Sequence, residues 1–338
     1  MKAEGVGWGK LYIVGEYAVV HPGYPAVILA TQLKIRATIE ESTRFALKTA
    51  NNSREIVFDD LNVSDEYWKY AISALMVFYD FLKEKGQAVT PVSITVESDL
   101  DSEDGRKLGL GSSGAVVAAI IKGLNCFYNQ NLNHTAIFKL CVISQKRLDV
   151  SGSFGDLAAA VFGGIIRYTR FADFDNFGSA RKSVESEWPQ LSISYLDFPF
   201  EFHLAVGWTG EPVLTQSRVN QIKKLSEDVG YRILLNQSGK IVDDLVQSKS
   251  VYEFLDSIRL YRSWLKSLEE ISHLMIETPL IATFIDICLT HGGAAKSSGA
   301  GGGDCAVAFF AHPVSISDIL LSKGIMPLTI TIAKREVL

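Results

Sequence analysis

The sequence has few cysteines and lacks long apolar runs. Its four cysteines, in a chain of 338 residues, stand far apart and form no CxxC pair, which is typical of reduced thiols rather than a disulfide framework. No uninterrupted apolar stretch approaches the ~18–20 residues that a membrane span needs, and the N-terminus shows no signal-peptide core. These absences predict a cytoplasmic protein without a membrane partner.

Positive charge and metal-binding patterns are also scarce. Lysine and arginine number 33 against 38 acidic residues, a net charge of −5, so no basic field would draw the chain onto nucleic acid. The six histidines contain no i, i+4 pair and no HExxH motif, which disfavours a zinc site. The phosphate loop G-x-x-x-x-G-K-[ST] is missing as well. Any anionic ligand must therefore be held locally, by a loop of another kind.

What the chain does contain indicates two globular domains of mixed helices and strands. A length of 338 residues is large for a single hydrophobic core. A polar stretch between about 171 and 190 is the candidate boundary, which gives an N-terminal domain of residues 1–185 and a C-terminal domain of residues 186–338. In the N-terminal domain, periodicity and turn residues predict short strands within 6–39, a strand at 91–97, and helices at 65–85, 113–128, 135–148 and just after 156. In the C-terminal domain they predict strand-like sequence at 191–208, strands at 305–310 and 327–332, and helices at 216–229, 241–249, 251–276 and 315–323.

The strongest chemical signal is a glycine-rich turn between a predicted strand and an apolar helix. It reads Gly109-Leu110-Gly111-Ser112-Ser113-Gly114. Glycines without a Cβ let backbone N–H groups approach phosphate oxygens, and the following helix directs the positive end of its dipole at the same charge. A tight turn that only starts a helix would explain the loop equally well when it is taken alone. The loop therefore needs support from other segments.

Three segments carry a family resemblance: residues 9–19, GKLYIVGEYAV; the loop 109–114; and residues 296–305, KSSGAGGGDC. In this order they resemble the N-terminal motif, the nucleotide-binding loop and the C-terminal glycine motif of the GHMP kinases. This is the superfamily of galactokinase, homoserine kinase, mevalonate kinase and phosphomevalonate kinase. The resemblance implies an α+β, two-domain GHMP kinase fold with the active site in the cleft between the domains. It also implies ATP as co-substrate, Mg²⁺ as cofactor and a small-molecule substrate.

A fourth segment, residues 152–164, reads GSFGDLAAAVFGG. Within the family it resembles the phosphomevalonate kinase form, in which Gly-[Ser/Gly]-x-Gly-Asp precedes an alanine-rich helix. Mevalonate kinases usually carry a Pro-Ser-Gly-x-Asp variant, and no proline occurs here. Tyr17 follows Glu16 where the family often has histidine, which favours the same branch. The implied reaction transfers the γ-phosphoryl group of ATP to the phosphate of 5-phosphomevalonate.

The resemblance gives Lys10 and Asp156 the catalytic positions. Lys10 would bridge the acceptor and the transferring phosphoryl group, where negative charge accumulates; a solvated surface lysine is the alternative. Asp156 could take a proton from an alcohol acceptor, or it could only cap a helix. A phosphomonoester acceptor is already ionised near pH 7, because its second pKa is ~6. For such an acceptor we expect Asp156 to orient Lys10 rather than to remove a proton.

Other polar residues are candidates for contacts to the metal, the phosphates and the acceptor. Ser113 is the candidate Mg²⁺ ligand, because a hydroxyl beside the phosphates can complete an octahedron of phosphate oxygens and water. The helix before Asp156 has no glutamate where mevalonate kinases place a metal ligand, which leaves direct carboxylate coordination open. Substrate contacts are predicted for Lys107, Lys146, Arg147, Ser153, Ser217, Ser297, Ser298 and Gly299. For the three cations, a solvated helix face explains the charge equally well.

Three other functions fit the same motifs. A mevalonate kinase or another GHMP kinase would act on an alcohol and would lack a site for the acceptor phosphate. Diphosphomevalonate decarboxylase shares the fold, but its segment around the catalytic aspartate differs from residues 152–156. A catalytically inactive GHMP-type metabolite sensor is the non-enzyme alternative, and the presence of both Lys10 and Asp156 argues against it. The sequence leaves the oligomeric state and the adenine contacts open.

Overall fold

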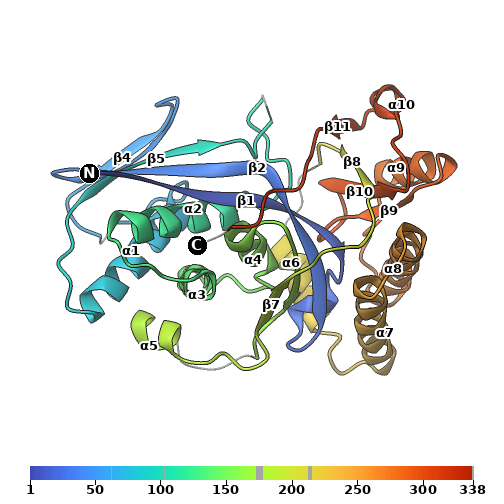
Figure 1. The fold of residues 1–338 in the computed structure, drawn as a ribbon, viewed down its shortest axis with the longest axis horizontal. Helices are drawn as coiled ribbons and strands as arrows, with labels where there is room; N and C mark the ends of the chain where they lie inside the picture. Colours follow the sequence, from blue (N-terminus) through green and yellow to red (C-terminus); the bar gives the residue numbers. More distant parts are fainter. Residues whose placement is uncertain (62, 103, 173–177, 212–214, 337–338) are drawn as a thin grey trace.

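Two β-sheets organise the computed structural model, which describes residues 1–61, 63–102, 104–172, 178–211 and 215–336 (Figure 1). Within these ranges the first sheet has seven strands in the order β4-β3-β5-β2-β6-β7, with β1 paired to β2. The strands are β1 (Lys2–Val14), β2 (Pro25–Glu41), β3 (Phe45–Thr49), β4 (Glu55–Phe58), β5 (Val92–Ser98), β6 (Ile165–Thr169) and β7 (Ser192–Tyr195).

Strands β1 and β2 form one long antiparallel pair, so the prediction of short strands within 6–39 is wrong. Side chains from Lys2 to Lys10 alternate between buried and more exposed positions, as expected of a half-buried strand. The register then shifts near Gly9 and again near Val14, and the end of β1 is buried on both faces. Such bulges and two-sided burial remove the period of two, which hid the length of the strand in the sequence.

Helices cover one face of the first sheet (Figure 1). They are α1 (Lys69–Glu84), α2 (Ser112–Phe127), α3 (His134–Lys146), α4 (Gly155–Phe162) and α5 (Ala180–Glu185). Helix α2 packs along β1 and β2, α4 packs on β1 and α2, and α1 packs on α2 and α3. Helix α1 also reaches the sheet, because the ring of Tyr79 lies 5.7 Å from that of Phe45 on β3. The apolar faces predicted for α1 and α2 are confirmed as core-facing.

The second sheet has the strand order β11-β8-β10-β9. Its strands are β8 (His203–Trp208), β9 (Ala294–Ser297), β10 (Cys305–Phe310) and β11 (Met326–Leu328), and the helices of this half are α6 (Thr215–Lys223), α7 (Val229–Val246), α8 (Val251–Ser272), α9 (Pro279–Thr290) and α10 (Ser317–Ser322). Helix α7 begins well before the predicted residue 241, and α9 was not predicted. The start of α9 nonetheless follows the usual sequence pattern of a helix N-terminus. The Thr278 side chain accepts a hydrogen bond from the N–H of Ile281, and proline occupies the first turn.

Segments that follow the predicted boundary also contribute to the first sheet. Strand β7 pairs with β6 in the first sheet, although it follows residue 185. The C-terminal segment also returns to that sheet, where Ile332 forms a β-bridge with Thr31. Further along, the indole N–H of Trp8 donates to a carboxylate oxygen of Glu336 at 2.7 Å. The first sheet therefore takes contacts from both sides of the predicted boundary.

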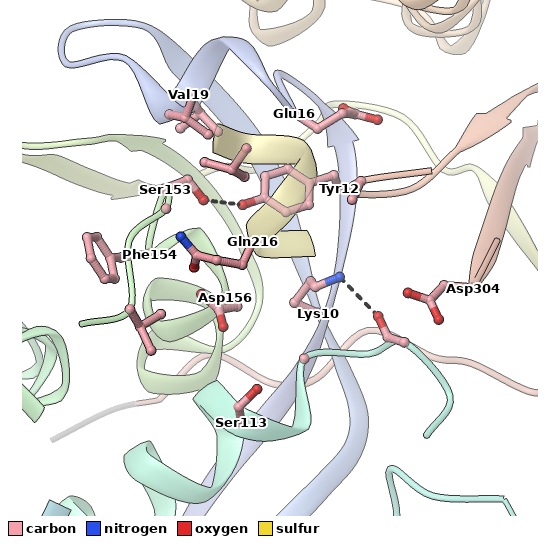
Figure 2. A pocket seen from close by; sticks show the side chains of 18 of the residues that line it. Lys10, Tyr12, Glu16, Val19, Ser113, Ser153, Phe154, Asp156, Gln216 and Asp304 are labelled. Carbon is pink, nitrogen blue, oxygen red and sulfur yellow. Dashed lines mark hydrogen bonds between the residues drawn. The ribbon is translucent and has the colours of Figure 1, made fainter. Parts of the chain in front are cut away.

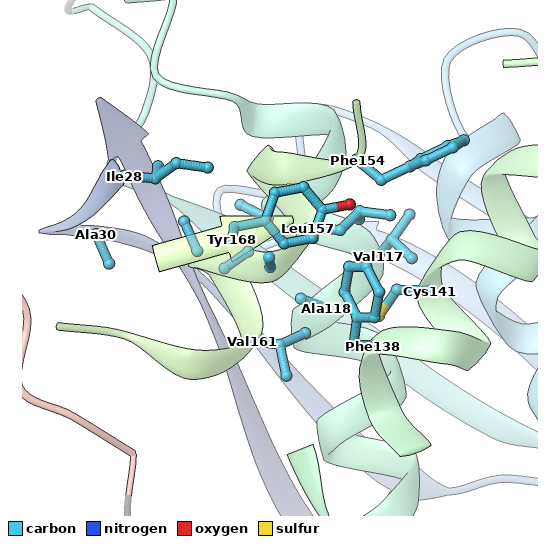
Figure 3. Packing of buried hydrophobic residues seen from close by; sticks show 14 of the residues in the cluster. Ile28, Ala30, Val117, Ala118, Phe138, Cys141, Phe154, Leu157, Val161 and Tyr168 are labelled. Atoms are coloured by element: carbon cyan, nitrogen blue, oxygen red, sulfur yellow. The ribbon is translucent and has the colours of Figure 1, made fainter. Parts of the chain in front are cut away.

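A continuous core lies between the first sheet and its helices. Figure 3 shows part of it, where Ile28 of β2, Val117 of α2, Phe138 of α3 and Leu157 of α4 are fully buried. A smaller cluster fills the space between the second sheet and helices α9 and α10. Because α2 and α4 pack side by side on β1, their N-terminal ends open toward the same region. That region holds the candidate site.

Candidate active site

A cavity of about 400 Å³ lies where elements of the two halves meet. Its wall includes β1, the loop before α2, the loop before α4, helix α6 and the glycine-rich loop between β9 and β10 (Figure 2). Of the residues predicted for the site, it is lined by Lys10, Lys107, Gly109, Gly111, Ser112, Ser113, Ser153, Asp156, Ser298 and Gly299. All three motifs of the family resemblance contribute to this list.

The predicted phosphate loop forms one end of the cavity. Gly109 and Gly111 have φ angles of +74° and +83°, which glycine adopts without strain. Gly111 is also the N-cap of α2, and no side chain caps that end. The N–H groups of Ser112 and Ser113, in the first turn, are therefore left for an anionic ligand, whereas that of Gly114 donates to the carbonyl oxygen of Gly111 at 3.1 Å.

The letters of this loop also fit the G-x-G-x-x-G of dinucleotide sites, but its structural context differs. Strand β5, which precedes the loop, pairs with β2 in antiparallel orientation. Its parallel neighbour, β3, comes earlier in the chain and not after α2. The loop therefore does not belong to the βαβ unit that holds a dinucleotide.

Lys10 lies at the centre of the cavity and is tied to the phosphate loop twice. Its ammonium group donates to the carbonyl oxygen of Gly109 at 3.1 Å, and its backbone N–H donates to that of Leu110 at 2.8 Å. A methyl group on Gly111 would lie 3.1 Å from Cγ of Lys10 and 3.5 Å from Cβ of Asp156. The loop thus lies between the two predicted catalytic side chains, and glycine is required for this approach.

Asp156 lies in the first turn of α4, whose N-cap is Phe154. The carboxylate is therefore not the N-cap of this helix, which was the alternative to catalysis. It sits against α2, because a Cβ on Gly114 would lie 2.7 Å from its Oδ2 atom. Burial raises the pKa of Asp156, and the nearby Lys10 ammonium opposes this shift. Both residues are described, and no ion pair joins them within 4.0 Å.

The other end of the cavity is formed by hydroxyl groups from three segments. The Tyr12 hydroxyl and the Ser153 Oγ are 2.9 Å apart, within hydrogen-bond distance. The Oγ of Ser298 accepts a hydrogen bond from the backbone N–H of Tyr12 at 2.8 Å. Figure 2 shows Ser113 on one side of Lys10 and the Tyr12–Ser153 pair on the other. The cavity thus has a phosphate-loop end and a hydroxyl-rich end, with Lys10 between them.

A buried ion pair joins the N-terminal motif to the C-terminal glycine motif. The Lys296 ammonium contacts the Glu16 carboxylate, and the two residues are 0% and 2% exposed. Burial raises the pKa of Glu16, an effect that the Lys296 charge opposes, and burial lowers the pKa of Lys296. Lys296 also donates to the carbonyl oxygen of Ser297 at 2.6 Å. The pair fixes the root of the glycine-rich loop beside the end of β1.

Several predicted residues lie outside the lining of the cavity. Leu110 and Gly114 are the buried members of the phosphate loop, and Ser297 is buried in β9. Ser217 is exposed on α6. The Lys146 ammonium lies 5.6 Å from the centre of the Phe154 ring, whereas Arg147 forms an ion pair with Asp80 at 2.6 Å. The ion pair with Asp80 accounts for Arg147 without a role in phosphate binding.

The lining also includes polar residues that were not predicted for the site, among them Tyr12, Glu16, Gln216 and Asp304. Tyr12 and Glu16 belong to the N-terminal motif, and alternation with Lys10 along β1 could have identified Tyr12. Asp304 lies against Gly109, since a Cβ there would be 2.9 Å from its Oδ1 atom. Its approach is a long-range contact that no local pattern reveals.

The described residues include no cluster of three or more His, Cys, Asp or Glu side chains able to hold a metal ion. A divalent cation at this site would therefore take most of its ligands from phosphate oxygens and water. Ser113, in the first turn of α2 and at the cavity wall, is placed to add one hydroxyl. In the described part of the chain, no helix has the length and apolar character needed to cross a membrane.

The fold and the cavity define a class of phosphate-handling enzymes, and the comparisons with known proteins agree. The family model "GHMP kinases N terminal domain" matches residues 69–164, and "GHMP kinases C terminal" matches residues 245–322. The chain belongs to the GHMP kinases.

Two of the most similar relatives with a stated activity are phosphomevalonate kinases. A phosphomevalonate kinase of Streptomyces sp. (strain CL190) is 31% identical over 360 residues, covering 96% of this chain and 95% of the relative. The crystal structure of the Lin0012 protein from Listeria innocua has a TM-score of 0.91 and 31% identity, and covers 99% of each chain. The Streptococcus pneumoniae phosphomevalonate kinase in complex with phosphomevalonate and AMPPNP has a TM-score of 0.83 and 27% identity, and covers 98% of this chain and 99% of that one.

Proposed function

We propose that this chain is an ATP-dependent phosphomevalonate kinase, which converts 5-phosphomevalonate and ATP to 5-diphosphomevalonate and ADP. The observation that carries the proposal is the 31% identity with the Streptomyces phosphomevalonate kinase along nearly the whole of both chains. The cavity agrees with it, because a phosphate loop and a hydroxyl-rich end flank Lys10. The solved complex of the Streptococcus pneumoniae enzyme with AMPPNP supports ATP as the donor.

The donor phosphates bind at the phosphate-loop end. The uncapped N-terminus of α2 and the loop before it supply backbone N–H groups, and Lys107 lines the same cavity. Ser113 would hold Mg²⁺ together with phosphate oxygens, and the ion would neutralise part of the charge on the transferring group. Lys146 stays a candidate for a phosphate contact from the outer edge of the site.

The acceptor binds at the hydroxyl-rich end, where Ser153 and Ser298 meet Tyr12. A phosphate oxygen of the acceptor attacks the γ-phosphorus, and the bond from that phosphorus to the β–γ bridging oxygen breaks as ADP leaves. Lys10 lies between the two ends, where its charge stabilises the oxygens of the transferring group.

Asp156 acts by orientation rather than by proton removal. An acceptor phosphate has a second pKa of ~6, so its attacking oxygen is already ionised near pH 7. Asp156 contributes negative charge close to Lys10 and restrains where the ammonium points when it leaves Gly109 for a ligand. Burial raises the pKa of Asp156, and Lys10 limits that rise, which couples the two side chains electrostatically.

An ADP-release assay with three acceptors tests the proposal. Phosphomevalonate should support turnover far better than mevalonate or homoserine at equal concentration, with ATP saturating. Preferential turnover of mevalonate would overturn the assignment to this branch, while the membership in the GHMP kinases would stand. Binding of ATP without turnover of any of the three acceptors would favour the metabolite sensor.

A further inference from the structure

The backbone at Tyr17 is strained. Its φ and ψ angles are 66° and −54°, and the N–H of Ala18 donates to the carbonyl oxygen of Glu16 at 2.8 Å. These values describe a γ-turn with a positive φ at its centre, a rare turn that is unfavourable for a residue with a bulky side chain. Tyr17 is nonetheless 4% exposed and lines the cavity. Strain of this kind persists where the surroundings require it, often at functional sites.

The turn directs the Tyr17 side chain to the glycine-rich loop between β9 and β10. The Tyr17 hydroxyl donates to the carbonyl oxygen of Ala300, in the middle of that loop. Burial raises the pKa of Tyr17 to about 12, so the hydroxyl keeps its proton throughout the neutral range. The hydrogen bond is therefore available at any pH at which the enzyme works.

The loop needs such an anchor because it consists largely of glycine. Gly299, Gly301 and Gly302 have φ angles of 86°, 59° and 77°, and glycine backbones lose the most conformational freedom when they are fixed. The root of the loop is held by Ser298, whose N–H donates to Cys305 at 3.0 Å, and its far side by Gly302, whose N–H donates to Ile276 at 2.7 Å. Tyr17 holds the stretch between these two points.

That stretch lies beside the predicted catalytic lysine. A Cβ on Gly299 would be 3.4 Å from the Lys10 ammonium nitrogen, and Gly299 and Ala300 both line the cavity. The N–H groups of Gly299, Ala300 and Gly301 form no hydrogen bond to any described residue. Unpaired N–H groups next to an ammonium group form a site for an anion.

We propose that Tyr17 is a positioning residue for the acceptor: its strained turn and hydroxyl hold the loop at 299–301 so that the backbone N–H groups and Lys10 together bind the acceptor phosphate. This inference rests on the proposed function for the identity of the acceptor. The hydroxyl acts through the loop and does not itself touch the reacting atoms.

The variant Tyr17→Phe tests this directly, because it keeps the buried ring and removes only the hydroxyl. The Kd and KM for phosphomevalonate should rise roughly 3- to 10-fold, as expected for the loss of one neutral hydrogen bond that organises a binding loop. The Kd for an ATP analogue should stay within about twofold, since the phosphate loop is not altered. The matched control is Tyr79→Phe, a buried tyrosine outside the cavity whose hydroxyl donates to Thr90 at 2.6 Å; it should leave both Kd values unchanged.

Amide hydrogen exchange supplies a second measurement that does not depend on the acceptor's identity. In Tyr17→Phe the hydrogen-bonded amides of Ser298 and Gly302, at the two ends of the anchored stretch, should exchange faster than in the parent, while Tyr79→Phe should leave them unchanged. Unaltered exchange and an unaltered acceptor Kd in Tyr17→Phe would overturn the proposal, as would equal weakening of the acceptor and the nucleotide. Faster exchange in an enzyme that does not use phosphomevalonate would support the anchoring role and refute only the proposed substrate.

Discussion

Removing one charge of the buried Glu16–Lys296 pair should destabilise the protein more than removing both. Lys296→Met leaves the Glu16 carboxylate, which is 2% exposed, without its cation in a region that water does not reach. Breaking such a pair from one side typically costs about 3–5 kcal/mol. This is a large part of the ~5–15 kcal/mol that stabilises a typical protein. The double variant Glu16→Gln/Lys296→Met buries no net charge and should cost clearly less than the sum of the single changes.

Urea unfolding of the parent, both single variants and the double variant, followed by tryptophan fluorescence, gives the coupling free energy. We expect about 2 kcal/mol or more of favourable coupling between the two side chains, which exceeds the error of such a cycle. In Lys296→Met the pKa of Glu16 should rise further, so the folded state should regain stability as the pH falls toward ~4, the usual range of a glutamate. Additive effects with no pH dependence would refute the view that these two charges compensate each other.

Three further variants test the roles of the cavity residues. Lys10→Met should lower kcat by about 10³-fold or more while ATP still binds, because it deletes charge where the transferring group needs it; a loss of less than tenfold would remove Lys10 from that role. Asp156→Asn should keep measurable activity that rises with pH through the acceptor's second ionisation near ~6, and inactivity at every pH in a folded, ligand-binding variant would make Asp156 an obligatory base. Because burial raises the pKa of Asp156, its charge opposes folding above the unfolded value of ~3.9, so the same variant should have the higher Tm at pH 7 and lose this advantage near pH 4. Ser113→Ala should raise the Mg²⁺ concentration needed for half-maximal rate, whereas an unchanged requirement would leave Ser113 as a helix-start residue only.

The local features of this fold were accessible from the sequence. Helices α1, α2, α3 and α8 carry apolar stripes or continuous apolar surfaces, and the phosphate loop stands out as a glycine cluster before a helix. The regions predicted as 65–85 and 113–128 agree with the structure to within a few residues. Patterns of this kind depend on neighbours in sequence, which is why they survive without knowledge of the tertiary contacts.

The features that could not be predicted are those made by distant segments. The length of strand β1 could not be predicted, because its second half is buried on both faces and lacks the alternating pattern. Strand β7 could not be assigned to the first sheet, because it follows the polar stretch that suggested a domain boundary. The partner of Glu16 is 280 residues away along the chain, and the Tyr17 hydroxyl contacts a loop residue 283 residues away. Neither contact can be read from the sequence, because its two residues are neighbours only in the folded chain.

The identity of the acceptor group is the central claim, and phosphorus NMR of the reaction mixture tests it most directly. With phosphomevalonate, ATP and Mg²⁺, we predict that the single resonance of the phosphomonoester disappears as two coupled resonances of a diphosphate ester appear, in step with the formation of ADP. Lys10→Met should form this product far more slowly under the same conditions. A phosphomonoester formed from mevalonate, with phosphomevalonate left unchanged, would contradict the account and show that the enzyme phosphorylates an alcohol.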